Sequence, residues 1–252
     1  MPANDDPRYA GCPATVVAAA ESGVALRPAR WGIGDVIAMI AISLALAAAG
    51  GLALNALDAP LAATIIVGGL LGWVGLAGWP IIATIRRGNG PRIDLGLRLT
   101  WGDVRAGVWG GLIALAVAAV IAAILMRVVG TFDSAAGAAA ARLLEGGDRW
   151  AILVFSLMIL VGAPIVEELA FRGLAYGAVR KRGLGTGWAI VISAVLFSLM
   201  HVEPTRIPLL LGIGLVLGWV RARTGSTGAA MIAHAVVNAP GALFLMFGGV
   251  TP

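Results

Sequence analysis

The segment GVWGGLIALAVAAVIAAILM, residues 107–126, has no charged side chain and is long enough to cross a lipid bilayer as a helix. A helix needs about 20 apolar residues for this, because it rises about 1.5 Å per residue and the hydrocarbon core is about 30 Å thick. Six further apolar segments surround it, at about 32–56, 61–85, 151–179, 188–203, 208–220 and 228–248. Those at 188–203 and 208–220 are short for a full span. We therefore expect an all-α polytopic membrane protein with about seven transmembrane helices.

The composition agrees with a membrane protein. Hydrophobic residues make up 60% of the chain and charged residues only 12%, with a mean hydropathy of +0.94. Soluble domains carry about 25% charged residues, and a soluble chain of this length could not bury so much apolar surface. The net charge of +5 does not indicate nucleic-acid binding, since the basic residues are scattered at the ends of apolar segments. The expected surroundings are a lipid bilayer, with no nucleic-acid partner.

The basic residues predict the orientation in the membrane. With the N-terminus inside, thirteen basic residues fall on the cytoplasmic side and four on the outer side. The thirteen are Arg8, Arg27, Arg30, Arg86, Arg87, Arg92, Arg98, Arg105, Arg180, Lys181, Arg182, Arg221 and Arg223, and the four are Arg127, Arg142, Arg149 and Arg206. Because cytoplasmic loops are enriched in Lys and Arg, we expect a cytoplasmic N-terminus and an outer C-terminus.

The chain divides into three expected parts. Residues 1–30 are predicted to be a disordered cytoplasmic tail, 31–150 to hold N-terminal transmembrane helices and loops, and 151–252 to form a C-terminal helical core. The polar stretch 91–105 predicts a short interfacial helix, and the Ala-rich stretch 130–150 an amphipathic helix at the outer surface. Cys12 is the single cysteine, so an intrachain disulfide is not possible.

Polar side chains interrupt the apolar C-terminal part in three places. They include both histidines of the chain and its only adjacent glutamates. Ionisable groups are unfavourable in lipid, so membrane helices that carry them usually need them for a function. The residues concerned are Glu167, Glu168, Arg172, His201, His234 and Asn238.

The two glutamates are expected to have different roles. Glu168 and Arg172 are four residues apart on a helix and can form an ion pair, which by itself does no more than fix helix packing. Glu167 points about 100° away and has no such local partner, so it is free to act as a general base. Pro164, three residues before Glu167, removes a helix hydrogen bond and is expected to kink the helix there.

The histidine segments have the same four-residue spacing. Phe197 and His201 share one helix face, and so do His234 and Asn238. Taken separately, His201 fits a core histidine bonded to a backbone carbonyl, and the second pair fits helix–helix hydrogen bonding. Taken together, Glu167, His201 and His234 lie about 17 to 20 Å along their helices, so they can meet at one depth. The short connection after His201 leaves irregular backbone, which membranes tolerate only beside protein or a water-filled cavity. We expect a buried intramembrane cavity.

Hydrolysis is the chemistry that such a group of side chains supports. A glutamate and a histidine can deprotonate a water molecule, while a second histidine and an amide donate to the developing oxyanion. Ser198 lies near His201, but a serine in a regular helix is not poised as a nucleophile. Glu167, His201 and His234 are also candidate zinc ligands, although their spacing is not His-Glu-x-x-His. The requirement for a divalent metal therefore stays open, and no organic cofactor is expected.

The motifs Glu167-Glu168-x-x-x-Arg172, Phe197-x-x-x-His201 and His234-x-x-x-Asn238, in this order, resemble those of the CPBP intramembrane proteases. That family joins CAAX prenyl endopeptidases with bacteriocin-processing and bacteriocin-immunity proteins, and the resemblance covers about 151–247. It implies an intramembrane endopeptidase in a bacterial plasma membrane that acts on membrane-associated or prenylated-type peptides. Metal-dependent and metal-free glutamate–water mechanisms are both considered for this family.

The resemblance also implies a role for each matching residue. Glu167 and His201 would activate the water, and His234 and Asn238 would form the oxyanion site. The supporting residues would be Glu168, Arg172 and Phe197. Residues 151–252 would then be a CPBP-like catalytic core.

Two other functions use the same residues. Glutamate and histidine at mid-membrane also form proton relays, so a proton-coupled transporter is an alternative, although no matching halves are visible in the sequence. A non-catalytic bacteriocin-immunity or scaffold membrane protein is the other alternative.

Overall fold

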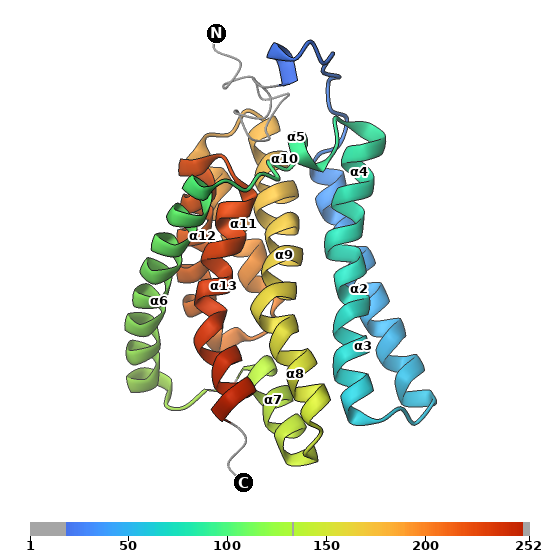
Figure 1. The fold of residues 1–252 in the computed structure, drawn as a ribbon, viewed down its shortest axis with the longest axis vertical. Coiled ribbons are helices and arrows are strands. Elements are labelled where there is room, and N and C mark those ends of the chain that lie inside the picture. The colour runs from blue at the N-terminus through green and yellow to red at the C-terminus, as the bar shows by residue number, and fades with distance from the viewer. Residues whose placement is uncertain (1–18, 133, 249–252) are drawn as a thin grey trace.

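The structure is a computed structural model that describes residues 19–132 and 134–248. Cys12 and the larger part of the predicted 1–30 tail lie outside the described residues. The described chain is a bundle of long helices that run roughly parallel or antiparallel to one another (Figure 1).

In the part of the chain that the structure describes, seven long helices form the bundle. The first is α2 (Ile33–Ala56), and the second joins α3 (Leu61–Trp73), the π-helical segment η3 (Val74–Gly78) and α4 (Trp79–Arg87). The third is α6 (Trp101–Val129). The fourth joins α8 (Arg149–Leu157), η4 (Met158–Gly162), α9 (Ala163–Glu168), η5 (Leu169–Ala175) and α10 (Tyr176–Lys181). The last three are α11 (Thr186–Met200), α12 (Ile207–Thr224) after the 3-10 turn η6 (Pro204–Arg206), and α13 (Thr227–Leu243) with η7 (Phe244–Gly248).

Six of these helices are long and apolar enough to cross a membrane, and α11 is a shorter apolar helix. The expected all-α polytopic membrane fold with about seven helices is therefore confirmed. Within the described chain, two short helices lie between the long ones: α5 (Pro91–Asp94) and α7 (Ala135–Gly146).

Two predicted boundaries were wrong. The third helix begins at Trp101 rather than near residue 107, because Thr100 and Asp103 form a capping box in which each side chain binds the other's backbone N–H. The interfacial helix expected at 91–105 is therefore only the single turn α5. The sixth helix continues to Thr224 instead of ending near residue 220, and Gly225 ends it in the left-handed conformation (φ +68°).

The Ala-rich stretch at 130–150 contains α7, as expected. Ser134 caps the start of this helix and Gly147 its end. Leu143 is its buried residue and packs with Ile152 and Phe155 of α8, while most of its other side chains are exposed. The helix is therefore amphipathic and lies against the end of the fourth helix (Figure 1).

Glycines on α6 allow α13 to pack closely against it. A Cβ atom at Gly107 would lie 2.6 Å from the Cβ of Ile232, and one at Gly111 would lie 2.5 Å from the Cβ of Val236. Neither contact is sterically possible, so these positions accept only glycine at this helix separation. Lipid supplies no hydrophobic force between helices, and close packing of small residues replaces it.

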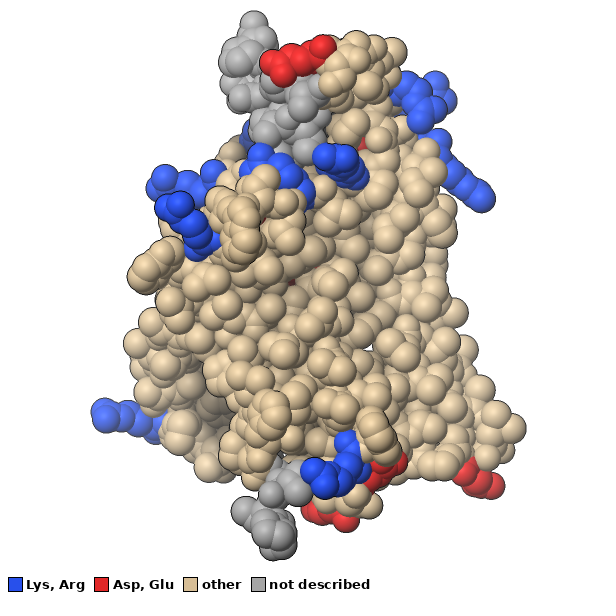
Figure 2. All heavy atoms as spheres, in the orientation of Figure 1, with Lys and Arg blue, Asp and Glu red and all other residues tan. Residues whose placement is uncertain are grey.

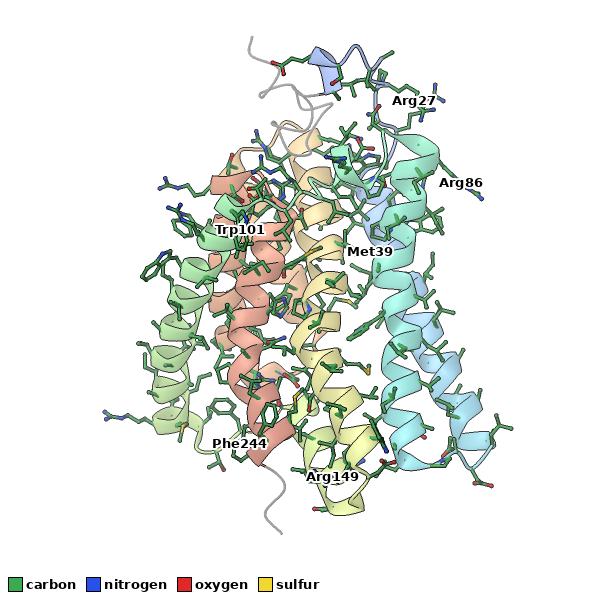
Figure 3. All side chains as sticks on the ribbon, viewed as in Figure 1. Arg27, Met39, Arg86, Trp101, Arg149 and Phe244 are labelled. Atoms are coloured by element: carbon green, nitrogen blue, oxygen red, sulfur yellow. The ribbon has the colours of Figure 1, made fainter. Side chains whose placement is uncertain are left out.

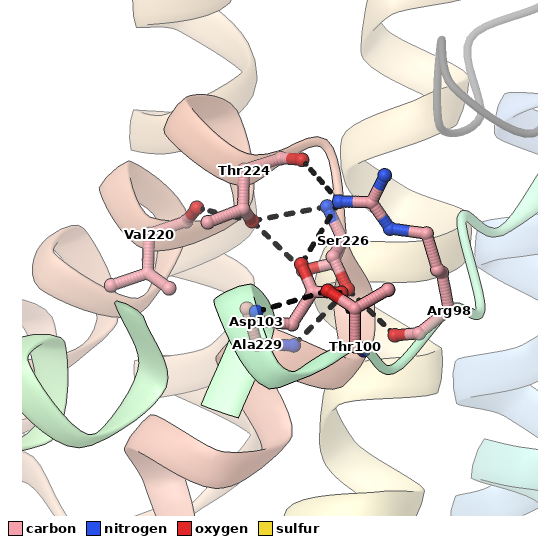
Figure 4. A network of polar contacts seen from close by, with 7 residues as sticks. All are labelled: Arg98, Thr100, Asp103, Val220, Thr224, Ser226 and Ala229. Atoms are coloured by element: carbon pink, nitrogen blue, oxygen red, sulfur yellow. Dashed lines mark hydrogen bonds and ion pairs between the residues drawn. The ribbon is translucent and has the colours of Figure 1, made fainter. Parts of the chain in front are cut away.

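A polar network connects the start of α6 to the turn between α12 and α13 (Figure 4). Arg98 donates through Nη2 to Asp103 Oδ1 at 2.9 Å and to the Thr224 carbonyl at 3.1 Å. The Ser226 hydroxyl donates to the Arg98 carbonyl at 2.7 Å and caps α13 by accepting from the Ala229 N–H at 3.2 Å. This network sets where α13 begins and therefore the height of His234 in the bundle.

The charged residues are separated along the bundle axis. Figure 2 shows Lys and Arg gathered mainly at one end, with uncharged residues covering the middle. In Figure 3, Arg27 and Arg86 lie at that end and Arg149 at the other. At this end of the bundle, α2 and α6 begin and α4, α10 and α12 terminate. We call it the basic end.

Candidate active site

The fourth helix carries the glutamates between two π-helical segments. In η4 the Ala163 N–H bonds to the Met158 carbonyl, five residues back. In the same five-residue pattern, the carbonyl of Ile159 would accept from the N–H of residue 164. Residue 164 is proline, which has no backbone N–H, so this hydrogen bond cannot form. Asn238 of α13 fills this gap, because its Nδ2 donates to the Ile159 carbonyl at 2.9 Å. Pro164 thus creates an acceptor that attaches the seventh helix to the fourth.

The second π-helical segment, η5, is buried along its whole length. The Tyr176 N–H bonds to the Phe171 carbonyl, again five residues back. The following carbonyl, that of Arg172, accepts from Arg221 Nε at 3.1 Å, and the Arg221 guanidinium lies 5.1 Å from the centre of the Tyr176 ring. Arg221 lies in the last turn of α12, as expected of a charge at a helix end. Only 2% of the residue is exposed, however, and it packs inside the bundle, which was not expected.

Glu168 is completely buried and binds two helices at once. Its Oε1 accepts from Arg172 Nη1 at 2.8 Å and from His234 Nδ1 at 3.0 Å. Arg172 is equally buried, and its Nη2 donates to the Gly214 carbonyl of α12 at 2.9 Å. The expected Glu168–Arg172 pair is present, but it also connects the fourth, sixth and seventh helices. A carboxylate oxygen only accepts, so Nδ1 of His234 carries the hydrogen.

Glu167 lies on the other side of the His234 ring. Its Oε2 is 4.0 Å from His234 Nε2, and among the described residues this oxygen has no hydrogen-bond partner. The side chain is 16% exposed, in contrast to the fully buried Glu168. Glu167 therefore presents an unsatisfied carboxylate oxygen beside an imidazole that Glu168 holds in place.

The Phe197 ring lies at the centre of the site. Its centroid is 4.8 Å from that of His201 and 5.7 Å from that of His234, with both rings in edge-on contact. The Arg172 guanidinium stacks over it at 4.7 Å, and Phe171 touches its other edge. Phe197 is 1% exposed, so both histidines pack against a ring that is enclosed by the bundle.

His201 is the C-cap residue of α11, and its ring is hydrogen-bonded to the backbone of Phe197. Its Nδ1 lies 2.8 Å from the Phe197 carbonyl and must donate to it, which leaves Nε2 as the open ring nitrogen. Val202 follows with a positive φ of 54°, unusual for a β-branched residue, and the backbone stays irregular as far as η6. Irregular backbone after His201 was expected from the sequence.

The structure brings some of the candidate residues into contact and leaves others apart. Glu167, Glu168, Arg172 and His234 form one contiguous cluster, and His201 joins it through Phe197. Among the described residues, no hydrogen bond or ion pair joins Glu167 to His201. The imidazole nearest to the Glu167 carboxylate is therefore that of His234. The Ser198 hydroxyl donates to the Ala194 carbonyl at 2.8 Å, as expected for a serine that is not a nucleophile.

Sequence reasoning missed three members of the cluster. They are the Gly214 and Ile159 carbonyls and the Arg221 side chain. Arg221 directly follows the predicted segment 208–220, so its position in the sequence indicated a charge at a helix end and not one that faces the bundle interior. The carbonyls carry no residue-type signal, except that Pro164 marks the loss of a donor to Ile159.

The candidate zinc ligands do not form a ready metal site. In the part of the chain that the structure describes, no group of three His, Cys, Asp or Glu side chains is arranged to hold a metal ion. Glu167 and His234 are neighbours, but His201 is not close enough to complete a set with them. The Nδ1 atoms of both histidines are bonded to protein acceptors, which leaves their Nε2 atoms open, as in histidines that bind metals. As placed, the three candidate side chains do not converge into a three-ligand set among the described residues.

An apolar cavity of about 500 Å³ lies beside the cluster, between the fourth and seventh helices. Pro164 and Ile165, which line it, precede Glu167 on the fourth helix, and Ala235 follows His234 on α13. Leu97 and Leu99 from the segment before α6 line it toward the basic end. The cavity is therefore lined by residues close in sequence to Glu167 and His234, together with Arg98, while the side chains of the cluster themselves do not line it.

These features define a polytopic membrane protein whose polar site is enclosed by the fourth to seventh helices. Residues 149–240 match the family of type II CAAX prenyl endopeptidases, Rce1-like. This part of the chain thus matches an Rce1-like domain of the CPBP group, as the motifs implied, and that family is one of proteases. The match includes every residue of the candidate site, from Glu167 to Asn238. No curated protein and no solved structure gives a match.

Proposed function

We propose that this protein is an intramembrane endopeptidase that hydrolyses membrane-associated or prenylated-type peptides with a water molecule activated by Glu167. One observation carries the proposal: the Glu167 carboxylate accepts no hydrogen bond from any described residue, although its Oε2 lies 4.0 Å from an oriented imidazole inside a membrane bundle. Glu168, in contrast, accepts two hydrogen bonds through Oε1, as expected for a structural glutamate. The Rce1-like match over the same residues supports a protease.

In the proposed reaction, Glu167 accepts a proton from water as the oxygen attacks the carbonyl carbon of the peptide bond. His201 contributes its open Nε2 as a second acceptor for the same water. The proton then passes from Glu167 to the leaving nitrogen as the carbon–nitrogen bond breaks. The products are a new carboxyl end and a new amine.

The oxyanion of the tetrahedral intermediate needs donors, and we assign these to His234 and Asn238. Asn238 has one amide hydrogen on the Ile159 carbonyl and a second still to donate. In its protonated form His234 donates through Nδ1 to Glu168 and through Nε2 toward the oxyanion. Glu168, Arg172 and Phe197 act as positioning residues that hold the ring in this direction.

The cavity beside the cluster is the proposed place for the substrate. Its apolar walls fit an aliphatic or prenyl chain or the apolar side chains of a membrane-bound peptide. We further propose that the basic end faces the bacterial cytoplasm and that the protein resides in the plasma membrane.

The proposal is tested with purified protein in liposomes that contain a membrane-associated peptide. Glu167→Gln keeps the size of the side chain but removes the base, so we expect cleavage to fall at least about 100-fold. Glu145→Gln, on the exposed face of α7, is the matched control and should cleave normally. Comparing peptide N-termini in membranes of cells with the native chain and with Glu167→Ala would then identify substrate and cleavage site. Full activity in both Glu167→Ala and His201→Ala would contradict the assignment.

A further inference from the structure

A second cavity, of about 590 Å³, lies at the basic end, far from the site described above. It is formed where the start of α2 meets the ends of α4 and α10. Lys181, which lines it, is 14 residues after Glu167 on the fourth helix, a distance of about 20 Å along the axis. The cavity therefore does not belong to the proposed peptidase site.

The lining of this cavity is strongly cationic. Its charged residues are Arg30, Arg87, Lys181, Arg182 and Asp35. Four positive charges and one negative charge sum to a net charge of +3. The Asp35 carboxylate is already engaged by protein groups. It accepts hydrogen bonds from the Gly32 N–H at 2.9 Å and from Trp79 Nε1 at 3.2 Å, and it forms an ion pair with Arg87.

The four cations differ in how far they are already engaged. Lys181 donates to the Ala29 carbonyl at 2.8 Å and to the Trp31 carbonyl, and Arg87 holds Asp35 with its side chain 43% exposed. Arg30 and Arg182 are exposed, and their guanidinium groups make no hydrogen bond or ion pair with any other described residue. The cavity therefore has two cations that are engaged by protein groups, Lys181 and Arg87, and two guanidinium groups, those of Arg30 and Arg182, without a partner among the described residues.

The position of the cavity indicates the source of an anionic ligand. Its lining runs from Arg30, just before α2 and outside the first membrane span, to Ala38, which is inside that span. Trp31 and Trp79 also line it, and tryptophan is enriched where the headgroups of a bilayer lie. A free anion would need only the charged residues of the lining, whereas an amphipathic molecule would also use the apolar residues Ile33 and Ala38.

We propose that this cavity binds the phosphate group of an anionic phospholipid, with Arg30 and Arg182 as its principal ligands. Guanidinium groups bind phosphate oxygens through two parallel N–H donors, which suits a phosphodiester at this depth. The acyl chains of the lipid would follow the membrane-exposed face of α2. The bound lipid joins the start of the first helix to the end of the fourth.

Native mass spectrometry of the full chain in detergent tests this assignment. The protein is titrated with phosphatidylglycerol and, separately, with phosphatidylcholine of the same acyl chains. We expect the first phosphatidylglycerol to bind more tightly than phosphatidylcholine. The double variant Arg30→Gln/Arg182→Gln should weaken that binding about 30-fold and leave phosphatidylcholine unchanged. Arg30→Lys/Arg182→Lys should bind phosphatidylglycerol more tightly than the glutamine variant but less tightly than the native chain, because the charge is kept while the two parallel donors are lost.

The matched control is Arg142→Gln/Arg149→Gln, which removes two exposed arginines from the opposite end of the bundle. It should bind phosphatidylglycerol as the native chain does, and thermal unfolding should show that all variants are folded. Equal binding of the two lipids, or equal loss in the control variant, would overturn the proposal. Displacement of phosphatidylglycerol by inorganic phosphate at millimolar concentration would also overturn it, and would assign the cavity to free phosphate.

Discussion

A single oxygen of Glu168 accepts hydrogen bonds from Arg172 and His234, which come from two different helices of the bundle. Both glutamates of the adjacent pair therefore contact the same imidazole, Glu168 at Nδ1 and Glu167 at Nε2. Their surroundings separate their roles. Glu168 has no exposed surface and is neutralised by Arg172, whereas Glu167 reaches the accessible side of the ring.

The buried Glu168–Arg172 pair leads to a prediction about stability. Glu168→Leu leaves the Arg172 charge buried without its partner, so we expect a loss of about 3–5 kcal/mol in the free energy of unfolding. Glu168→Leu/Arg172→Leu removes both charges and should be clearly more stable than the single variant, although it should not cleave. The measurement is denaturant unfolding in mixed micelles. Equal stabilities of the single and double variants would show that the pair is not coupled.

At the level of elements, the fourth helix is important because its regular hydrogen bonding is interrupted twice. Segments η4 and η5 each contain a backbone carbonyl that accepts a hydrogen bond from a side chain of another helix. The Ile159 carbonyl accepts from Asn238, and the Arg172 carbonyl accepts from Arg221. The glutamates lie between these two attachments. A regular α-helix would satisfy both carbonyls internally and would lose these two attachments to α12 and α13.

A double-mutant cycle can test the role of Pro164. Asn238→Ala in the native background leaves the Ile159 carbonyl unpaired, and we expect it to lower stability by about 1 kcal/mol. Pro164→Ala restores an N–H that can serve this carbonyl, so the same Asn238→Ala change should then have little effect on stability. The coupling energy of the cycle is measured from unfolding curves. Additive effects would mean that Asn238 does not replace the donor that proline removes.

The close approach of α6 and α13 gives a second prediction at this level. Gly111→Ala places a methyl group against Val236 and the Ala233 carbonyl, so the helices must separate at a cost of about 1–3 kcal/mol. Gly51→Ala is the matched control, since a Cβ atom there meets nothing within 4 Å. Thermal unfolding of the two variants should differ by several degrees. Because α13 carries His234, Gly111→Ala should also reduce cleavage.

For the whole molecule, the charge distribution predicts the orientation in the membrane. The basic end holds Arg86 at its surface, and the opposite end holds Glu145 on α7 (Figures 1 and 3). In a chain with Cys12→Ser, a cysteine introduced at Glu145 should react with a membrane-impermeant maleimide in intact cells. A cysteine introduced at Arg86 should react only after the cells are opened. The reverse labelling pattern would place the basic end outside.

Much of this organisation could be predicted from local sequence. The apolar segments located all seven helices, because burial in lipid depends on the composition of about 20 consecutive residues. Spacing alone predicted the Glu168–Arg172 pair, because residues four apart on a helix are always neighbours. Boundaries were less accurate where polar residues lie within a helix, as at Arg221 and Arg223 near the end of α12.

Relations between helices could not be predicted in this way. Glu168 and His234 are 66 residues apart in sequence, and their contact depends on the rotation and register of α13. The same is true of Asn238 on the Ile159 carbonyl, of the inward position of Arg221, and of the placement of Glu167 beside His234.

The sequence by itself therefore determined the membrane class, the helices and the set of polar residues, since each depends on composition and short-range spacing. Only the tertiary structure decided which imidazole faces Glu167 and that a cationic cavity forms at the basic end. The physical reason is that both depend on close packing between helices. In lipid this packing is governed by glycines, backbone carbonyls and buried charges that lie far apart along the chain.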